Sequence, residues 1–176
     1  MLELFKDDFH SVIGTLYYIW KALNNCPEIV FLGNDRKAFD RYIEKLKIKF
    51  SDAELYNRKS EEVEIKISNY LAGRTPDIDL KPYFLTGSDF EKKIWLSTIK
   101  IPYGAAISYK ELAQKAGFTR AWRAAGTALN HNPVMLIVPC HRVIKSSGEI
   151  GFFGRDTKIK EFLLNLENIS KNKKIK

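Results

Sequence analysis

The sequence predicts a mixed α+β protein, in which a small amino-terminal α/β domain with a short antiparallel sheet precedes a mostly helical domain containing a helix-turn-helix. Three observations support this prediction. Strand-like segments lie near the amino terminus, helical periodicity with capping signals follows residue 88, and a glycine turn at residue 117 separates two short helices. The linker-like segment 76–82 favours two domains, 1–81 and 82–176.

The amino-terminal domain is expected to begin with paired strands. Residues 14–20 and 28–32 are rich in β-branched and aromatic side chains, and a turn containing Asn and Pro separates them. Two helices are expected next, over 35–47 and 61–72, because apolar residues recur every three or four positions and Gly73 ends the second. A sheet covered by amphipathic helices follows from this pattern.

The second domain is expected to be built from capped helices. Two capping boxes, each a Ser followed three residues later by Glu, begin helices at Ser88 and Ser108 that run to about residues 100 and 116. After the turn at Gly117, Thr119 is expected to cap a third helix over 120–130. Helix, short glycine turn and helix form the helix-turn-helix pattern.

The helix over 120–130 has two different faces. Trp122, Ala125 and Leu129 share one side at helical spacing and are expected to face the core. The outer surface of the helix carries short side chains at Ala121, Ala124 and Ala128. Another side carries Arg123, Thr127 and Asn130. A low surface with one long cation suits close approach to a nucleic-acid groove, although such helix pairs also occur as scaffolding.

The last expected helix spans 157–167 and is capped by Asp156. Its apolar stripe is formed by Ile159, Phe162, Leu163 and Leu166. It ends in Glu167. Most glutamates at such positions are only solvated, so Glu167 acquires a function only if it pairs with a histidine.

The run Pro139-Cys140-His141-Arg142 is the main candidate for chemistry. The thiolate is the reactive form of cysteine, and cationic neighbours lower the pKa of a thiol. The loop after it, residues 143–154, contains three glycines that allow a ligand to approach the backbone, and Phe152 and Phe153 suit a flat aromatic ligand. An inert buried cysteine is the alternative interpretation, because free cysteines are often buried.

Charge is unevenly distributed along the chain. Residues 1–90 contain 13 Lys and Arg against 15 Asp and Glu, whereas residues 91–176 contain 16 against 6, so the net charges are −2 and +10. A basic region that also carries the reactive cysteine suggests a polyanionic partner, most simply nucleic acid. Part of the excess lies in the lysine-rich segment 171–176, which is expected to be solvated.

Composition also argues against several classes. No stretch approaches the ~20 apolar residues of a membrane span, and the first eight residues lack the layout of a signal peptide. We therefore expect no membrane partner and a cytoplasmic location, or a nuclear one in a eukaryote. Cys26 and Cys140 do not form a disulfide framework, and the histidines lack metal-binding spacing, so no metal or other cofactor is expected.

Across residues 82–167 the sequence resembles the O6-alkylguanine-DNA alkyltransferases, also called methylated-DNA–protein-cysteine methyltransferases. Five blocks occur in order and at family spacing: Ile101-Pro102-Tyr103-Gly104, Ile107 to Ala113, Arg123-Ala124-Ala125-Gly126, Asn132-Pro133 and Pro139 to Val143. The resemblance implies a DNA repair protein that binds double-stranded DNA and flips O6-alkylguanine, chiefly O6-methylguanine, out of the duplex. The alkyl group would pass irreversibly to its own cysteine in a single turnover.

The same resemblance implies roles for individual residues. Cys140 would accept the alkyl group, His141 would act as its base through a water, and Glu167 would orient that histidine. Asn132 would be the hinge that joins the recognition helix to the pocket, and Tyr109 would force the nucleotide outward.

The DNA contacts are also implied by the resemblance. In the family the helix-turn-helix meets the minor groove, and Arg123 would fill the gap left in the base stack. The carbonyl of Val143 and the amide of Gly154 are expected to read the guanine edge. Further contacts are expected from Ser108, Thr119, Ala124, Thr127 and Phe153. We expect a monomer.

The sequence departs from the family pattern at 153–156. Where the family commonly has a tyrosine, a serine and two glycines, this chain has Phe153, Gly154, Arg155 and Asp156. A phenolic hydroxyl near the leaving oxygen is therefore missing, and Arg155 is expected to narrow the pocket against bulky alkyl groups.

Two other classes are compatible with parts of the sequence. A lesion-binding module of the alkyltransferase-like kind would use the same DNA surface without transfer, but those proteins lack the cysteine. A Cys-His hydrolase or acyltransferase would turn over many times without DNA, and it leaves the helix-turn-helix and Arg123 unexplained.

Overall fold

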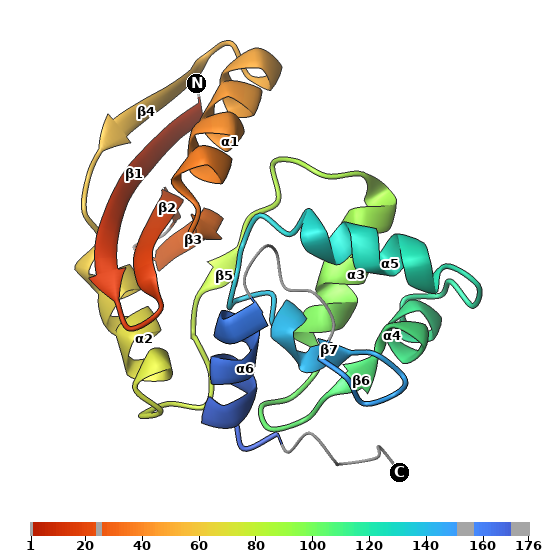
Figure 1. The fold of residues 1–176 in the computed structure, drawn as a ribbon. Helices are drawn as coiled ribbons and strands as arrows, with labels where there is room; N and C mark the ends of the chain where they lie inside the picture. Colours follow the sequence, from red (N-terminus) through yellow and green to blue (C-terminus); the bar gives the residue numbers. More distant parts are fainter. Residues whose placement is uncertain (1, 24–25, 151–156, 170–176) are drawn as a thin grey trace. The chain divides into compact units, whose positions relative to one another are not determined.

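The structure, a computed structural model, describes residues 2–23, 26–150 and 157–169. The chain divides into two compact units (Figure 1). The first contains residues up to Thr86 together with 133–137, and the second contains the remainder. The expected boundary between residues 81 and 82 falls inside strand β5 (Lys81–Pro82), which pairs with β3 (Cys26–Gly33).

The first unit is built on a five-stranded sheet of order β4-β1-β2-β3-β5. β1, β2 and β3 pair antiparallel, whereas β4 and β5 pair parallel to β1 and β3. The strands not yet delimited are β1 (Leu2–Ser11), β2 (Gly14–Leu23) and β4 (Ala53–Asn57). The mixed α+β class is confirmed, and the expected strand pair is present as β2 and β3. β1 and β4 were not predicted.

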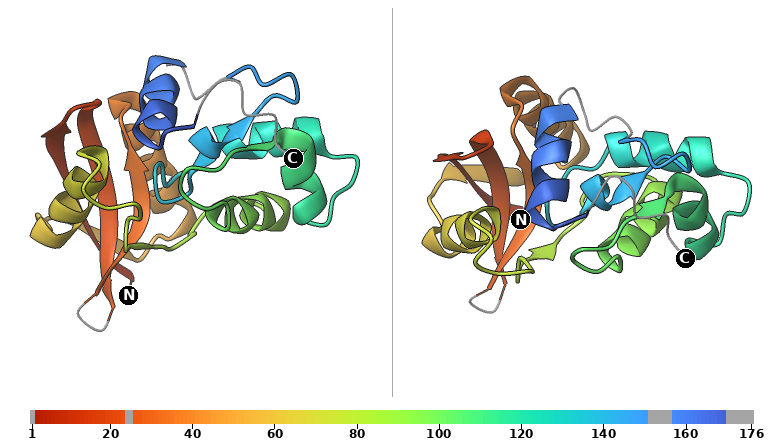
Figure 2. Two further views of the ribbon diagram at one scale, coloured as in Figure 1. Left: turned by 90° about the horizontal axis from the view of Figure 1, so that it is seen from below. Right: turned by 60° about the horizontal axis from the view of Figure 1, so that its bottom comes forward.

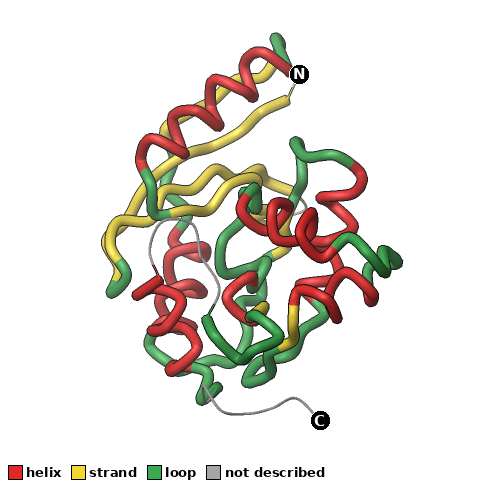
Figure 3. Tube along the Cα trace, turned by 45° about the vertical axis from the view of Figure 1, so that its right-hand side comes forward, coloured by secondary structure: helices red, strands yellow, loops and turns green. Residues whose placement is uncertain are grey.

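Two helices cover the sheet, as expected. Helix α1 (Arg36–Lys49), capped by Asp35, packs along one face, as Figure 3 shows. Its contacts form a core cluster of buried apolar residues: Leu4, Ile19, Val30, Phe31, Phe39, Tyr42, Leu46 and Leu85. Helix α2 (Glu61–Leu71) lies on the other face, because the Tyr18 hydroxyl accepts a hydrogen bond from the Ser60 amide, 2.9 Å away, at the start of α2, and successive strand residues face opposite ways.

A segment distant in sequence completes the first unit. The amide of Leu32 donates to the carbonyl of Pro133 over 2.8 Å, and the amide of Met135 donates to the carbonyl of Leu32 over 2.8 Å. Residues 133–137 therefore run beside β3. Leu136 within this segment has a φ of 72°, a left-handed conformation that is uncommon for a residue with a branched side chain.

The second unit consists mainly of helices around a small core (Figure 2). Helices α3 (Asp89–Ile99), α4 (Tyr109–Lys115) and α5 (Trp122–Asn130) pack on one another through buried apolar side chains. Both predicted capping boxes, at Ser88 and Ser108, are present. The elements that follow are the 3₁₀ helix η1 (Cys140–Arg142), the short parallel pair β6 (Ile107–Ser108) and β7 (Val143–Ile144), and helix α6 (Thr157–Leu166).

Helix α5 differs from the expectation in three respects. It begins at Trp122, and Thr119 does not cap it, because the chain first turns so that the amide of Ala121 bonds to the carbonyl of Phe118 over 3.2 Å. Trp122 was expected in the core but is 47 % exposed, because the first residue of the helix projects beyond the packed turn. Ala128 is buried instead, and its carbonyl accepts a hydrogen bond from the indole of Trp95 at 2.7 Å.

The buried face of helix α6 agrees in part with the prediction. Ile159 and Leu163 are buried as expected, Phe162 is 36 % exposed, and Lys160, which was not expected in the core, is fully buried. The expected cap residue Asp156 lies outside the described residues. The ammonium of Lys160 donates to the carbonyl of Val143, in the strand that follows η1.

Candidate functional site

The thiol of Cys140 is held at the start of η1 in the second unit. Cys140 is buried, and its amide donates to the carbonyl of Val138 over 2.8 Å. The side-chain amide of Asn132, just after α5, donates to the Cys140 sulfur at 3.3 Å and to the Val138 carbonyl at 3.1 Å. Asn132 thus fixes the sulfur and the backbone before it with one group.

The electrostatics of the thiol differ from the sequence expectation. Burial raises the pKa of Cys140, while the Asn132 hydrogen bond and the charge of Lys160 act in the opposite direction. The sequence led us to expect that cationic neighbours lower the pKa of the thiol. The guanidinium of Arg142, two residues from the thiol, is bonded to Glu167 at 2.9 Å. Of the described cations, Lys160 lowers the pKa of the sulfur most.

A buried network joins His141 and Arg142 to Glu167. Nε2 of His141 lies 2.8 Å from Oε1 of Glu167, and both side chains are fully buried. Arg142 donates to the same carboxylate through Nε at 2.9 Å and Nη2 at 2.9 Å. The backbone amide of Gly104 donates to Oε2 at 3.1 Å. Glu167 is therefore a shared acceptor.

The positions of Glu167 and Arg142 in the fold explain why this network forms. Glu167 is placed by the last turn of α6, where its amide still donates to the carbonyl of Leu163 over 3.0 Å. Arg142 also donates to the carbonyl of Ile101 at 2.6 Å, so the 101–104 segment is tied to η1. Of the sequence-predicted residues, the structure brings Cys140, His141, Asn132 and Glu167 together around η1.

Burial sets the charge of the histidine. It lowers the pKa of His141, and the adjacent Glu167 carboxylate partly counteracts that effect. The imidazole is therefore neutral near neutral pH. A neutral imidazole oriented by a carboxylate through one nitrogen can accept a proton at the other.

Lys160 is a site residue that the sequence reasoning missed. Its ammonium donates to the carbonyl of Val143 at 2.6 Å and lies 5.9 Å from the centre of the Tyr109 ring. Burial lowers the pKa of Lys160 to about 8, and the negative charge of Cys140 acts against that decrease. A signal existed, because Lys160 lies in the helical stripe of Leu163, Leu164 and Glu167.

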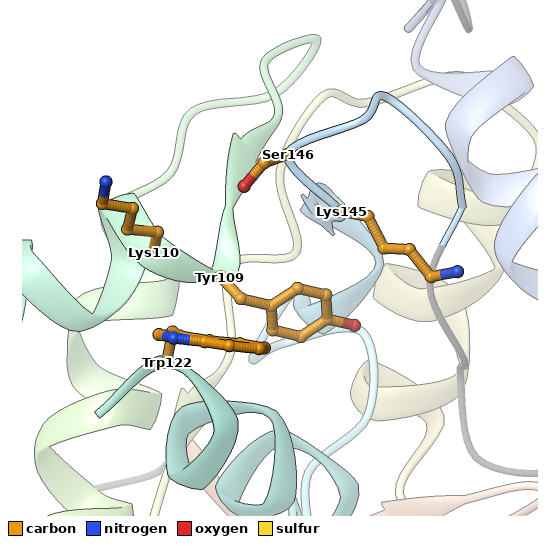
Figure 4. Close-up of a pocket in the computed structure, with 5 residues that line it drawn as sticks. All are labelled: Tyr109, Lys110, Trp122, Lys145 and Ser146. Atoms are coloured by element: carbon orange, nitrogen blue, oxygen red, sulfur yellow. The ribbon is translucent and has the colours of Figure 1, made fainter. Parts of the chain in front are cut away.

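Tyr109 lies between the thiol and the surface. It is the first residue of α4, and burial followed by the charge of Cys140 raises its pKa. Across from it, a side chain at Gly126 would place its Cβ 3.7 Å from the Tyr109 ring, so the glycine lets α5 lie close to the tyrosine. Tyr109 also lines a surface pocket of about 260 Å³ with Lys110, Trp122, Lys145 and Ser146 (Figure 4).

The remaining predicted residues are dispersed around this pocket and α5. Arg123, Ala124 and Thr127 are exposed on α5, and the Arg123 guanidinium lies 4.6 Å from the centre of the Trp122 ring. The Ser108 hydroxyl caps α4 and bonds to Glu111 at 2.7 Å. Thr119 is exposed in the turn before α5. Phe153, Gly154 and the departure at Arg155 lie outside the described residues.

Two further properties concern the described part of the chain. Within residues 2–23, 26–150 and 157–169, no group of three or more His, Cys, Asp or Glu side chains is arranged to hold a metal ion. No helix among these residues is long and apolar enough to cross a membrane.

Comparison with known proteins gives consistent matches. A family model described as 6-O-methylguanine DNA methyltransferase, DNA binding domain, matches residues 89–169. A methylated-DNA–protein-cysteine methyltransferase from Methanosarcina barkeri is 39 % identical over 142 residues, which are 79 % of this chain and 89 % of the relative. A protein of the same name from Methanosarcina mazei is 35 % identical over 163 residues, 90 % and 96 % of the two chains.

Solved structures agree in fold. The crystal structure of Mycobacterium tuberculosis O6-methylguanine methyltransferase matches with a TM-score of 0.76 and 28 % identity, over 93 % of this chain and 92 % of that one. A structure of Mycobacterium tuberculosis OGT in complex with DNA matches with a TM-score of 0.72 and 28 % identity, over 94 % and 92 %.

Proposed function

This chain belongs to the methylated-DNA–protein-cysteine methyltransferase family, and on that premise we propose that it repairs DNA by transferring the alkyl group of O6-alkylguanine, chiefly O6-methylguanine, to the sulfur of Cys140. One observation carries the proposal. The Cys140 sulfur accepts a hydrogen bond from Asn132, and the next residue, His141, is bonded to a buried glutamate at 2.8 Å. An inert cysteine has no need of this arrangement.

The first step is activation of the thiol. His141 presents Nε2 to Glu167, so the proton of the thiol passes to the Nδ1 side through a bridging water. The thiolate that forms is stabilised by the Asn132 donor and by the ammonium of Lys160. Because burial opposes thiolate formation, these two groups decide how much nucleophile is present at neutral pH.

The second step is displacement at the alkyl carbon. A bond forms between the Cys140 sulfur and this carbon, the carbon–oxygen bond breaks, and its electron pair stays on the guanine. The guanine takes up one proton and leaves neutral. In this proposal the proton comes from the Tyr109 hydroxyl or the Lys160 ammonium, two donors that interact electrostatically with Cys140. The thioether is a poor leaving group, so each molecule acts once.

Recognition of DNA falls to helices α4 and α5, which form a helix-turn-helix in this proposal. Arg123 enters the minor groove and fills the base stack, and exposed Ala124 permits close approach. The sugar-phosphate backbone of the DNA is contacted by three side chains at the ends and outer face of these helices: Ser108, Thr119 and Thr127. Tyr109 pushes the nucleotide toward the thiol. The net charge of +10 on residues 91–176 supports a DNA partner.

Recognition of the guanine edge involves groups around η1. The carbonyl of Val143 already accepts the Lys160 ammonium at 2.6 Å, and its second lone pair is available to the base. Phe153 and the amide of Gly154 complete the pocket in this proposal. The second unit acts as the DNA-binding and acceptor domain in this proposal. Its start is moved from residue 82 to Gly87, because Pro82 pairs with Ile29 of β3 in the first unit.

Intact-mass measurement tests the function directly. After incubation with a duplex containing O6-methylguanine, the parent protein should gain one CH₂ per molecule. The Cys140→Ser variant should gain nothing, whereas Cys26→Ser, which removes the exposed second cysteine, should gain the same mass as the parent. A gain that survives Cys140→Ser, or repeated turnover by one molecule, contradicts the proposal.

A further inference from the structure

Trp122 stands out because the proposed transfer reaction does not use it. It is 47 % exposed, whereas Trp20 and Trp95 are 7 % and 1 % exposed. A half-exposed indole at the start of a helix leaves part of its aromatic surface available to a ligand. Its position beside Arg123 and in the wall of the surface pocket indicates a function in ligand binding.

The pocket has the shape and chemistry of a site for one flat heterocycle. Its volume of about 260 Å³ is just below the ~300 Å³ at which ligand pockets usually begin, which suits a single nucleobase. Figure 4 shows the Trp122 indole edge-on, extending toward the Tyr109 ring, so two aromatic side chains contribute to the walls. Aromatic faces of this kind stack unpaired bases of any sequence.

Two lysines line the pocket from different elements, Lys110 on α4 and Lys145 after β7. Their ammonium groups point outward, away from the Trp122 and Tyr109 rings (Figure 4). The Lys145 ammonium is bonded to the exposed Glu149 carboxylate at 2.9 Å, a surface ion pair that a phosphate can replace. Aromatic walls between two lysines match a nucleotide, in which a base is joined to phosphates on both sides.

Two contacts connect the pocket to the proposed repair chemistry. Tyr109 belongs both to the pocket wall and to the surroundings of Cys140, since Lys160 lies 5.9 Å from its ring and bonds next to η1. Arg123 contacts the Trp122 ring at 4.6 Å but does not line the pocket. The indole can therefore hold the arginine and a base together.

We propose that the pocket formed by Tyr109, Lys110, Trp122, Lys145 and Ser146 binds an unpaired nucleobase outside the thiol site, with Trp122 as the stacking residue. This inference rests on the proposed function, because it takes the ligand to be DNA. The base stacks here, whether or not it is alkylated, before Tyr109 passes it toward Cys140. Selection for the alkyl group then occurs only in the second position.

The test compares two unmodified duplexes, one fully paired and one with a single unpaired guanine, by fluorescence anisotropy with the full-length protein. The parent should prefer the duplex with the unpaired base by about 5-fold or more. Trp122→Ala should abolish the preference without changing affinity for paired DNA, and Trp122→Phe should retain part of it. Leu96→Ala, which removes another half-exposed apolar side chain of the second unit, should behave as the parent.

Tryptophan emission gives an independent readout. The duplex with the unpaired guanine should quench the parent, and Trp122→Phe should lose most of the quenching, because the other two indoles are buried. An unchanged preference in Trp122→Ala, or an equal loss of affinity for both duplexes, overturns the inference. If the parent still gains CH₂ on Cys140, only this inference is wrong; if it gains none, the proposed function itself has failed.

Discussion

The ammonium of Lys160 lies 2.6 Å from the carbonyl oxygen of Val143, in the strand that directly follows the helical turn bearing Cys140. The contact places a buried cation beside a buried thiol. Burial disfavours the thiolate form of Cys140 and the ammonium form of Lys160. Because the two charges are opposite, the charged form of each group is favoured when the other group is charged. The thiol and the lysine therefore titrate as a pair.

Replacing Lys160 by methionine should slow alkyl transfer. The substitution keeps the length of the side chain and removes the charge, so the pKa of Cys140 rises further and the thiolate fraction falls roughly tenfold for each pKa unit. Rates measured from pH 6 to 10 should show a profile displaced to higher pH. An unchanged profile would mean that Lys160 serves only to bond Val143, and Lys158→Met, on the same helix but exposed, is the matched control.

The same lysine should make stability depend on pH. The pKa of Lys160 is about 8 in the folded protein and 10.5 when unperturbed. Between these two values the unfolded chain binds a proton that the folded chain does not, so stability rises with pH. The total rise is at most roughly 3 kcal/mol. Urea unfolding of Cys140→Ser should show this slope between pH 8 and 10.5, whereas Cys140→Ser with Lys160→Met should not.

Replacing Glu167 by glutamine should impair both folding and transfer. The change leaves the buried guanidinium of Arg142 without its counter-charge, which costs about 3–5 kcal/mol, and removes the carboxylate that orients His141. Urea unfolding measures the first effect, and single-turnover kinetics under folding conditions measure the second. Asp40→Asn, which breaks the exposed Arg36–Asp40 pair, should alter stability by less than ~1 kcal/mol. Equal effects of the two changes would refute the buried network.

Substitutions at Asn132 should show how much its hydrogen bond to the sulfur lowers the pKa of Cys140. Asn132→Ala removes the donor to the sulfur, so the pKa of Cys140 should rise, and Asn132→Asp should raise it more because a carboxylate then faces the thiolate. The pKa can be measured by the pH dependence of iodoacetamide alkylation. Asn130→Ala, on the exposed end of α5, should leave it unchanged. If Asn132→Asp reacts faster than Asn132→Ala, the assigned donor role is incorrect.

Much of the fold follows from local sequence signals. The capping boxes at Ser88 and Ser108 begin helices where predicted, because the cap and its glutamate lie within one turn and need no distant partner. Strand β4 was missed because its five residues, Ala-Glu-Leu-Tyr-Asn, become a strand only by pairing with β1. Edge strands take their definition from a partner that sequence periodicity does not reveal.

The site was predictable in its residues and less so in its electrostatics. Cys140, His141 and Asn132 could be identified because the family motifs carry them. The positively charged neighbour expected to act on the thiol could not be chosen from the sequence. Arg142, two residues from Cys140, is paired with Glu167, whereas Lys160, 20 positions away, lowers the pKa of the sulfur. Which cation acts on a sulfur depends on tertiary contacts, and those arise only when α6 packs on η1.

Glu167 follows Cys140 by 27 residues, at the end of the last described helix. During synthesis on the ribosome the cysteine therefore leaves the exit tunnel before the carboxylate that completes its histidine network. Until α6 packs on η1, the imidazole of His141 and the guanidinium of Arg142 lack their shared carboxylate acceptor. The order of residues along the chain thus makes the histidine network complete only after the last described helix has been synthesised.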